Sequence, residues 1–598
     1  MEKFALRAKR RRHLAVTNTF ETVLKAHRRI QRSAPPVQCL SDHEGNSIQP
    51  IDVPCLQLSY YQGIYDYQVL PTPNEVVFNI TREQLLCLSE AAATTRLRGN
   101  LNVGPDGLTA ELLHDLQVQQ IDELLALAVS PHITRPTSWN NIPVSVLPKP
   151  FAKTIFQNRL IAAQAASHKL YLHALKTVIL RDIGAQLDPL MGGIRSGDVV
   201  GAWISRLNVA VSKDEEWGIP LYLGCVDIAR AFATVDHAFL LRAAEALGVQ
   251  PTWVSLLHRE LISTNIDLHV KGEWVGTIQM QRGLVEGLPP SSLLLGIFLT
   301  FLWRRLRVTE TYSEHCMQFP NDFGVCPIRL HAAGWVDDWT MASGTRNGLQ
   351  SLITLFANAL RELGMSLALE KVSWMAAGVE RPSNMLYLEG NEIPRSGELI
   401  FLGALISIQG ALNHLDYRYR KMLGKWGFMQ RTLRTCSAST AISLQAAVAV
   451  ALPSLLWAME THPITGNVIL KMHSCFLVVL RSLFPKCGKY DEQQWIYMHS
   501  RIRSWFREGK LISPACFLYK RQETLYKFLK ARPEFDLNLL MDWRSNAWLA
   551  SKSRSTRPAR RFPGSPPKQL ESEFHMREGY SLDFRALSYA QRFNAAPF

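Results

Sequence analysis

The chain has 598 residues, of which 47% are hydrophobic, and a formal net charge of +15. This length and apolar fraction are those of a globular protein that can bury several cores, and no stretch is long and apolar enough to span a bilayer. The surplus of Lys and Arg favours a polyanionic partner such as nucleic acid, because basic side chains displace counterions from phosphates. Ten cysteines without a CxxC pair favour reduced thiols over a zinc knuckle or a disulfide framework.

The N-terminal segment is basic. It begins MEKFALRAKRRRHLAV and lacks the apolar centre of a signal peptide. This run fits a nuclear address, an RNA-binding arm or the charged face of a helix equally well, and an Arg-rich transit peptide is a further alternative. We assign residues 1–78 to a basic arm and linker. We expect an intracellular protein, with the nucleus favoured over the mitochondrion and the cytoplasm, and no contact with a membrane.

The rest of the chain divides by composition into three parts. Within residues 79–408, the stretch 79–127 has helical periodicity interrupted at GPDG. From residue 138 to about 408, strand-like runs alternate with longer amphipathic helices, which predicts a mixed α+β region. Residues 409–533 are mostly helical in pattern, and residues 534–598 form a basic tail for which we predict disorder. The basic positions of the helical part fit either a duplex-binding face or a solvated helix face. They are Arg418, Arg420, Lys421, Lys425, Arg431 and Arg434.

Two acidic segments lie within the mixed region. In RLHAAGWVDDWTM, from Arg329 to Met341, Asp337 and Asp338 interrupt two apolar runs that predict a buried hairpin. In LYLGCVDIARAFATVDH, from Leu221 to His237, an apolar run ends on Asp227. Two strands ending side by side would cluster the three carboxylates, whose repulsion a cation would relieve. Such hard oxygen ligands suit phosphoryl transfer by two metal ions, although a solvated turn is the alternative for the Asp pair alone.

A series of further motifs accompanies these two segments, in a fixed order along the chain. The series consists of LSDHEGNSIQP (40–50), GPDGLTAELL (104–113), VLPKP (146–150), NRLIA (158–162), MGGIRSG (191–197), VDIARAFATVDH (226–237), QRGLVEGLPPSSLLLGIFL (281–299), WVDD (335–338), LGMSLALEKVSWM (363–375), LIFLGALIS (399–407) and ALPSLLWAMETH (451–462). In this order the motifs resemble those of the reverse transcriptase of non-LTR (LINE-type) retrotransposons. The resemblance covers about residues 40–530.

The resemblance implies an α+β right-hand polymerase fold. Fingers and palm would occupy residues 79–408, and a helical thumb with the C-terminal region would occupy residues 409–533. The implied activity is that of an RNA-directed DNA polymerase, which extends a DNA primer on an RNA template with deoxynucleoside triphosphates.

The resemblance also implies the metal ligands. Asp227 and Asp337 would hold two Mg²⁺ ions, or Mn²⁺ in their place, with the Ile228 backbone carbonyl as a further ligand. Asp338 would complete the acidic cluster. Lys371, in LEKVSWM, would donate a proton to the pyrophosphate, because an ammonium group beside a departing phosphate is a suitable general acid.

Other residues match positions that contact the nucleotide in the family. Phe232 would lie beneath the incoming sugar and exclude a 2′ hydroxyl, and its alternative is a core aromatic. Lys149 and Arg159 are candidates to bind the triphosphate through charge-assisted hydrogen bonds, with a surface charge as the alternative for each. The turn that follows Glu286 and begins at Gly287 would let the backbone approach the template and the nascent base pair.

The chain departs from the family pattern at three positions. Ala233 stands where the family commonly has a second Asp, and Glu286 replaces a Gln and brings a negative charge near the nucleotide. Trp335 replaces the usual Tyr or Phe and fills more space. None of these changes removes a predicted metal ligand, but they put the rate, the nucleotide affinity and the fidelity in doubt.

These departures leave a second function open. A catalytically decayed, reverse-transcriptase-derived protein that binds RNA is the alternative to a working polymerase. An intron-encoded maturase would carry a splicing domain after the thumb, and the sequence shows no recognisable one. The roughly 80 residues before the polymerase are too few for a nuclease domain of ordinary size. Unless the chain is part of a longer protein, a separate endonuclease or an existing nick would therefore supply the primer.

Overall fold

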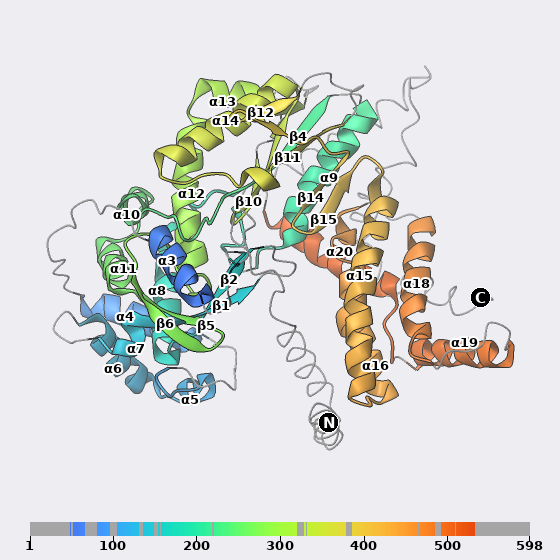
Figure 1. Cartoon of the computed structure of the whole chain (residues 1–598), viewed down its shortest axis with the longest axis horizontal. Helices are drawn as coiled ribbons and strands as arrows, with labels where there is room; N and C mark the ends of the chain where they lie inside the picture. The colour runs from blue at the N-terminus through green and yellow to red at the C-terminus, as the bar shows by residue number, and fades with distance from the viewer. Residues whose placement is uncertain are drawn as a thin grey trace.

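The computed structural model describes residue 48 and residues 52–65, 80–95, 105–130, 135–148, 154–155, 157–189, 191–195, 197–217, 220–319, 328–330, 332–377, 385–462, 466–484, 492–508 and 510–532. Lys149, most of the predicted arm and the predicted tail at 534–598 lie outside these residues. The described part combines helices with mixed sheets, which confirms the predicted α+β class (Figure 1). None of the helices within these ranges is long and apolar enough to cross a membrane.

A four-stranded sheet lies in the N-terminal half of the fold. Its order is β2-β1-β5-β6, with β1 at Asn141–Pro148, β2 at Asn158–Ala162, β5 at Asn265–Val270 and β6 at Glu273–Gln279. β1 and β5 bury every second side chain, because successive residues of a strand point to opposite faces. Helix α3 (Val53–Tyr65) packs against β6 and shares the core of this sheet. This sheet lies within residues 79–408, the range predicted for the fingers and palm.

Helices lie beside this sheet and against the five-stranded sheet that follows. They are α4 (Arg82–Thr94), α5 (Ala110–His114), α6 (Val118–Val129), α7 (Thr137–Asn140), α8 (Ala166–Ile183), α10 (His237–Ala246), α11 (Pro251–Ser263), α12 (Ser291–Arg307), α13 (Glu310–His315) and α14 (Arg346–Glu362). α4 begins with a capping box, in which the side chains of Thr81 and Gln84 bond each other's backbone N–H groups.

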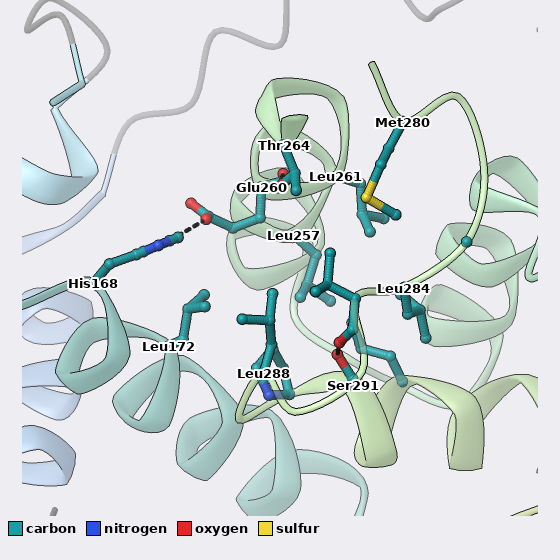
Figure 2. A pocket seen from close by; sticks show the side chains of 14 residues that line it. His168, Leu172, Leu257, Glu260, Leu261, Thr264, Met280, Leu284, Leu288 and Ser291 are labelled. Atoms are coloured by element: carbon teal, nitrogen blue, oxygen red, sulfur yellow. Dashed lines mark hydrogen bonds and ion pairs between the residues drawn. The ribbon is translucent and has the colours of Figure 1, made fainter. Parts of the chain in front are cut away.

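A buried ionic network lies between α8 and α11. The Glu260 Oε2 atom is 2.7 Å from the Arg135 guanidinium and 2.9 Å from His168 Nε2. A cavity of about 40 Å³ separates this network from the segment at 280–291, and leucine is the commonest residue in its wall (Figure 2). Burial alone would raise the pKa of the Glu260 carboxyl, but Arg135 and His168 outweigh it and lower the pKa from 4.5 to about 2. The charged carboxylate therefore stabilises the fold above pH 4.5.

Replacement of this carboxylate tests the network. We expect Glu260→Gln to lower the free energy of unfolding at pH 7 by about 3 kcal/mol, because the Arg135 charge stays buried without its counterion. A carboxyl with a lowered pKa loses its contribution as the pH falls from its unfolded to its folded pKa, here from 4.5 to about 2. Urea unfolding at several pH values should thus show parent and variant converging over this window. A constant difference across the window would contradict the ionic account.

The second sheet has five strands in the order β11-β4-β10-β9-β3. The strands are β3 (Met191–Gly192), β4 (Leu221–Asp227), β9 (Ala333–Trp335), β10 (Asp338–Ser343) and β11 (Ser373–Ala377). β10 and β11 flank β4 on either side, and both run antiparallel to it. Tyr222 and Val226 of β4 join the core that contains α12 and α14, whereas Leu221 and Leu223 join the core of α9 (Val200–Trp217). Because both faces of the sheet are covered, β4 is a nearly continuous apolar run.

The C-terminal part follows three small hairpins, whose strands are β7 (Met317–Phe319), β8 (Ile328–Leu330), β12 (Leu386–Leu388), β13 (Asn391–Ile393), β14 (Glu398–Phe401) and β15 (Ala404–Ser407). Helices α15 (Gly410–Thr435), α16 (Thr440–Ala446), α17 (Leu452–Leu455), α18 (Gly466–Arg481), α19 (Glu492–Arg507) and α20 (Pro514–Lys530) then follow. Much of this helical region packs around a core of its own (Figure 1). The helices agree with the predicted pattern, and the domain limits themselves stay a prediction.

One basic residue of this region is not on a solvated or duplex-binding face. Arg418 of α15 is buried and donates hydrogen bonds to the backbone carbonyls of Ser454 and Gly403. The Trp457 indole N–H bonds the carbonyl of Leu402, the other residue of the β14–β15 turn. Arg418 thus fixes this hairpin to the helical region, and both sequence-based alternatives were wrong for it. The other five basic positions of α15 are exposed.

Candidate active site

The three predicted carboxylates come from adjacent strands of the five-stranded sheet. β4 and β10 pair in a register that places Asp227 opposite Asp338. Asp337 lies in the tight turn between β9 and β10, after Val336 with its positive φ of 57°. The Ile228 N–H, just beyond β4, donates to the Asp337 carbonyl over 3.3 Å. The structure therefore brings Asp227, Asp337 and Asp338 together where the sequence analysis expected two strands to end side by side.

The electrostatics of this cluster favour a bound cation. Burial and the charges of Asp337 and Asp227 raise the pKa of the Asp338 carboxyl to about 6. Lys371, in the short 3₁₀ turn Leu369–Lys371, places its Nζ 2.5 Å from Asp227 Oδ2. Burial lowers the pKa of Lys371, but the hydrogen bond and charge of Asp227 outweigh it and raise the pKa above the usual 10.5. One ammonium group offsets only part of the negative charge of three carboxylates.

The donor atoms fit a magnesium ion that substrate would help to bind. Carboxylate and carbonyl oxygens are the hard donors that Mg²⁺ prefers, and in phosphoryl transfer it commonly takes one or two carboxylates together with substrate phosphates. Among the described residues, no group of three or more His, Cys, Asp or Glu side chains is arranged to hold a metal ion by itself. The site therefore fits a metal shared with a nucleotide better than a closed protein cage.

The other predicted site residues lie in different surroundings. Phe232 is half-buried against the main core, and its backbone carbonyl accepts a hydrogen bond from the Leu284 N–H over 2.7 Å. Glu286 and Gly287 are exposed at the turn before α12, and Gly287 has a φ of +91°. Arg159 is exposed on β2, an edge strand of the other sheet, so the structure does not place it in the carboxylate sheet.

Gly283 joins the two segments that carry these residues. Its N–H donates to the Val235 carbonyl over 2.7 Å, and its own carbonyl accepts from His237 Nε2 over 2.7 Å. Its φ is +87°, and a Cβ at this position would lie 2.5 Å from the Ala233 carbonyl oxygen. Only glycine allows this approach, so Gly283 lets the segments 228–237 and 281–291 lie close together.

Trp335 has a structural partner that the sequence analysis missed. Its ring packs edge-on against Trp203 at a centroid distance of 5.1 Å. A Cβ at Gly192 would lie 2.3 Å from the Trp335 ring, and one at Gly193 would lie 2.9 Å from its indole nitrogen. The adjacent glycines of MGGIRSG therefore make the space that the larger ring needs. The occurrence of two adjacent glycines in one motif and of a Trp in the WVDD segment was the feature of the sequence that could have indicated this contact.

The chain matches a known protein family over this same region. Residues 161–406 match the family model for "Reverse transcriptase (RNA-dependent DNA polymerase)". The Pol polyprotein of the type-2 retrotransposable element R2DM from Drosophila melanogaster is 21% identical over 51% of this chain and 29% of the relative. The Pol polyprotein of the type-1 retrotransposable element R2 from Popillia japonica is 23% identical over 54% of this chain and 45% of the relative. The chain thus spans less than half the length of these relatives.

Solved structures of telomerase are distantly similar. Apo telomerase from Candida tropicalis is 11% identical, with a TM-score of 0.33 over 87% of this chain and 90% of that one. Telomerase from Candida albicans, in complex with a fragment of telomeric RNA, is 10% identical, with a TM-score of 0.33 over 71% and 66%.

The family match covers the carboxylate sheet and most of the predicted palm motifs. It agrees with the α+β right-hand polymerase fold expected from the motif series. Residues 161–406 are a reverse transcriptase domain, and the chain is related at low identity to the Pol proteins of R2-type non-LTR retrotransposons.

Proposed function

We propose that the chain is an RNA-directed DNA polymerase of a non-LTR retroelement. The observation that carries this proposal is the antiparallel pairing of Asp227 with Asp338, with Asp337 in the adjoining turn, inside a reverse transcriptase domain. When bound, Mg²⁺ would activate the primer 3′ hydroxyl and neutralise charge on the phosphates. Asp227, Asp337 and the Ile228 carbonyl are the ligands we propose, and Asp338 sets the charge of the cluster.

Lys371 is the proposed proton donor. Its contact with Asp227 keeps Nζ protonated well above neutral pH. If a cation took the place of the ammonium group at Asp227, the ammonium group would be free to turn to the departing pyrophosphate and transfer a proton to it. The half-buried ring of Phe232 would lie beneath the sugar of the incoming nucleotide and exclude a 2′ hydroxyl by contact. Lys149 and Arg159 stay candidates for the triphosphate.

The proposed partners are polyanions. They are an RNA template, a DNA primer and deoxynucleoside triphosphates. The phosphates of all three would be attracted to a chain with a net charge of +15. The related proteins are Pol polyproteins of retrotransposable elements, which supports a role in copying element RNA. A separate endonuclease that supplies the primer end is a further proposed partner. We propose the nucleus as its place of action, where a chromosomal primer is available.

A decayed RNA-binding protein is the second candidate. The Lys371–Asp227 ion pair favours it, because the pair occupies a carboxylate that the metal would need. Ala233 and Glu286 favour it too, since both depart from the family pattern.

Primer extension separates the two candidates. Purified protein would be given dTTP, Mg²⁺ and oligo(dT) annealed to poly(rA), or to poly(dA), while RNA binding is measured on the same preparation. The proposal predicts extension on poly(rA). RNA binding without extension on either template would replace it with the second candidate.

A further inference from the structure

Helix α3 contacts both segments that form the candidate site, although it lies outside the matched residues 161–406. Figure 1 shows this helix beside β6, and the two elements pack against each other. Its C-terminal turns face the segment after Asp227 and the segment at 281–284. Three contacts define this relation.

The first contact joins α3 to the segment after Asp227. The Tyr60 hydroxyl accepts a hydrogen bond from the Arg230 guanidinium over 2.5 Å, and the guanidinium carbon lies 4.8 Å from the centre of the Tyr60 ring. Arg230 has a φ of +50°, which is unfavourable for a residue with a side chain, so a contact must stabilise it. The Arg230 carbonyl in turn accepts from the Ala233 N–H over 2.9 Å. Tyr60 thus contacts the residue on which this turn depends.

The other two contacts join α3 to the segment at 281–284. The Ile64 carbonyl accepts from Arg282 Nε over 2.8 Å, and the Tyr65 carbonyl accepts from the Gln281 N–H over 3.3 Å. Ile64 and Tyr65 are the last two residues of the helix, and their carbonyls have no partner within it. The end of α3 is therefore completed by the segment that leads to Gly283.

The helix itself is anchored to the body of the protein. Gln57 is buried and donates from Nε2 to the Ile155 carbonyl over 2.9 Å. Leu58 packs so closely on β6 that a Cβ at Gly276 would lie 2.8 Å from its side chain. Because α3 is fixed to the body of the protein on one side and bonded to both segments on the other, it can fix the position of the two segments relative to each other.

We propose that α3 is part of the catalytic unit and that Tyr60 is a positioning residue. By holding Arg230 in its left-handed conformation, Tyr60 fixes the turn between Asp227 and Phe232. This turn sets where the incoming deoxynucleotide lies relative to the carboxylates. The inference deepens the proposed polymerase function and rests on it for the identity of the ligand, but the coupling between α3 and the turn does not depend on catalysis.

A graded set of variants tests this coupling by amide hydrogen exchange on the full chain. Tyr60→Leu removes both contacts with Arg230, whereas Tyr60→Phe keeps the ring and loses the hydroxyl. We expect Tyr60→Leu to speed exchange at Ala233 and Leu284 by about tenfold and Tyr60→Phe to have a smaller effect. Leu56→Ala is the matched control, because Leu56 is an exposed residue of the same helix. The control should leave these amides unchanged.

Kinetics supply the second readout. We expect Tyr60→Leu to raise the KM for dTTP by about five- to tenfold with a smaller change in kcat, because positioning of the nucleotide is lost. Arg230→Ala should have the same effect, and the double variant should be no worse than either single variant. Additive effects, or equal effects of Tyr60→Leu and Leu56→Ala, would show that α3 only supports the fold.

The two readouts separate two kinds of failure. If the parent protein extends no primer, the proposed function fails, and hydrogen exchange still decides whether Tyr60 controls the turn. If the parent is active but Tyr60→Leu leaves both exchange and the KM unchanged, the positioning role is overturned while the polymerase proposal stands.

Discussion

Asp227→Asn is expected to reduce primer extension by about a thousandfold or more, with the fold retained. Asn has the shape of Asp but lacks the charge that a divalent cation requires, and Asp227 is the partner of both Asp338 and Lys371 in the candidate site. The expected loss should fall on kcat, because the cation acts on the reacting atoms rather than on the template. Single-nucleotide incorporation under saturating dTTP measures this directly.

Asp267→Asn is the control for this experiment. Asp267 lies on β5 and accepts a hydrogen bond from the Thr277 hydroxyl, so its replacement removes a carboxylate from the other sheet. We expect its activity to stay within about twofold of the parent. Equal losses in the two variants would mean that net charge, and not the carboxylate cluster, governs the reaction.

Gly283→Ala should have the second largest effect, acting through the fold of the site. The added methyl group would lie 2.5 Å from the Ala233 carbonyl oxygen, and the φ of +87° is unfavourable for alanine. We expect the free energy of unfolding to fall by about 3 kcal/mol or more, because overpacking and backbone strain add. Urea unfolding and primer extension of the same sample measure the two consequences.

Gly272→Ala separates strain from contact. Gly272 has a φ of +95°, but a Cβ there would meet nothing within 4 Å. This variant should lose only the conformational contribution, about 1 kcal/mol, and keep its activity. If Gly272→Ala and Gly283→Ala were equally destabilised, the close approach of the segments 228–237 and 281–291 would not be what requires glycine.

The carboxylate sheet was predictable because local patterns and chemistry agree there. Apolar runs that end on Asp227 and surround Asp337 predict buried strands. Carboxylates clustered at the ends of such strands would repel one another, which indicates a site for a cation. The pairing of Asp227 with Asp338 follows once both strands lie in one sheet. Lys371 was placed in the site by family resemblance, and the structure puts it in contact with Asp227.

Contacts between distant segments were not predictable in this way. Tyr60 and Arg230 are 170 residues apart, and neither has a local pattern that indicates the other. Arg418 carries a charge on a helix with other basic residues, so its burial depends on backbone carbonyls that only the fold supplies. Glu260 likewise occurs in an ordinary amphipathic helix, and its partners Arg135 and His168 come from separate segments.

The most direct test of the central claim compares the parent with a variant carrying Asp337→Asn and Asp338→Asn in primer extension on poly(rA) annealed to oligo(dT), with Mg²⁺ and dTTP. RNA binding and thermal unfolding of both proteins show that the variant is folded and still binds the template. The account predicts extension by the parent and none by the variant. Extension by both proteins would contradict a mechanism that depends on this pair of carboxylates, and extension by neither would contradict a working polymerase.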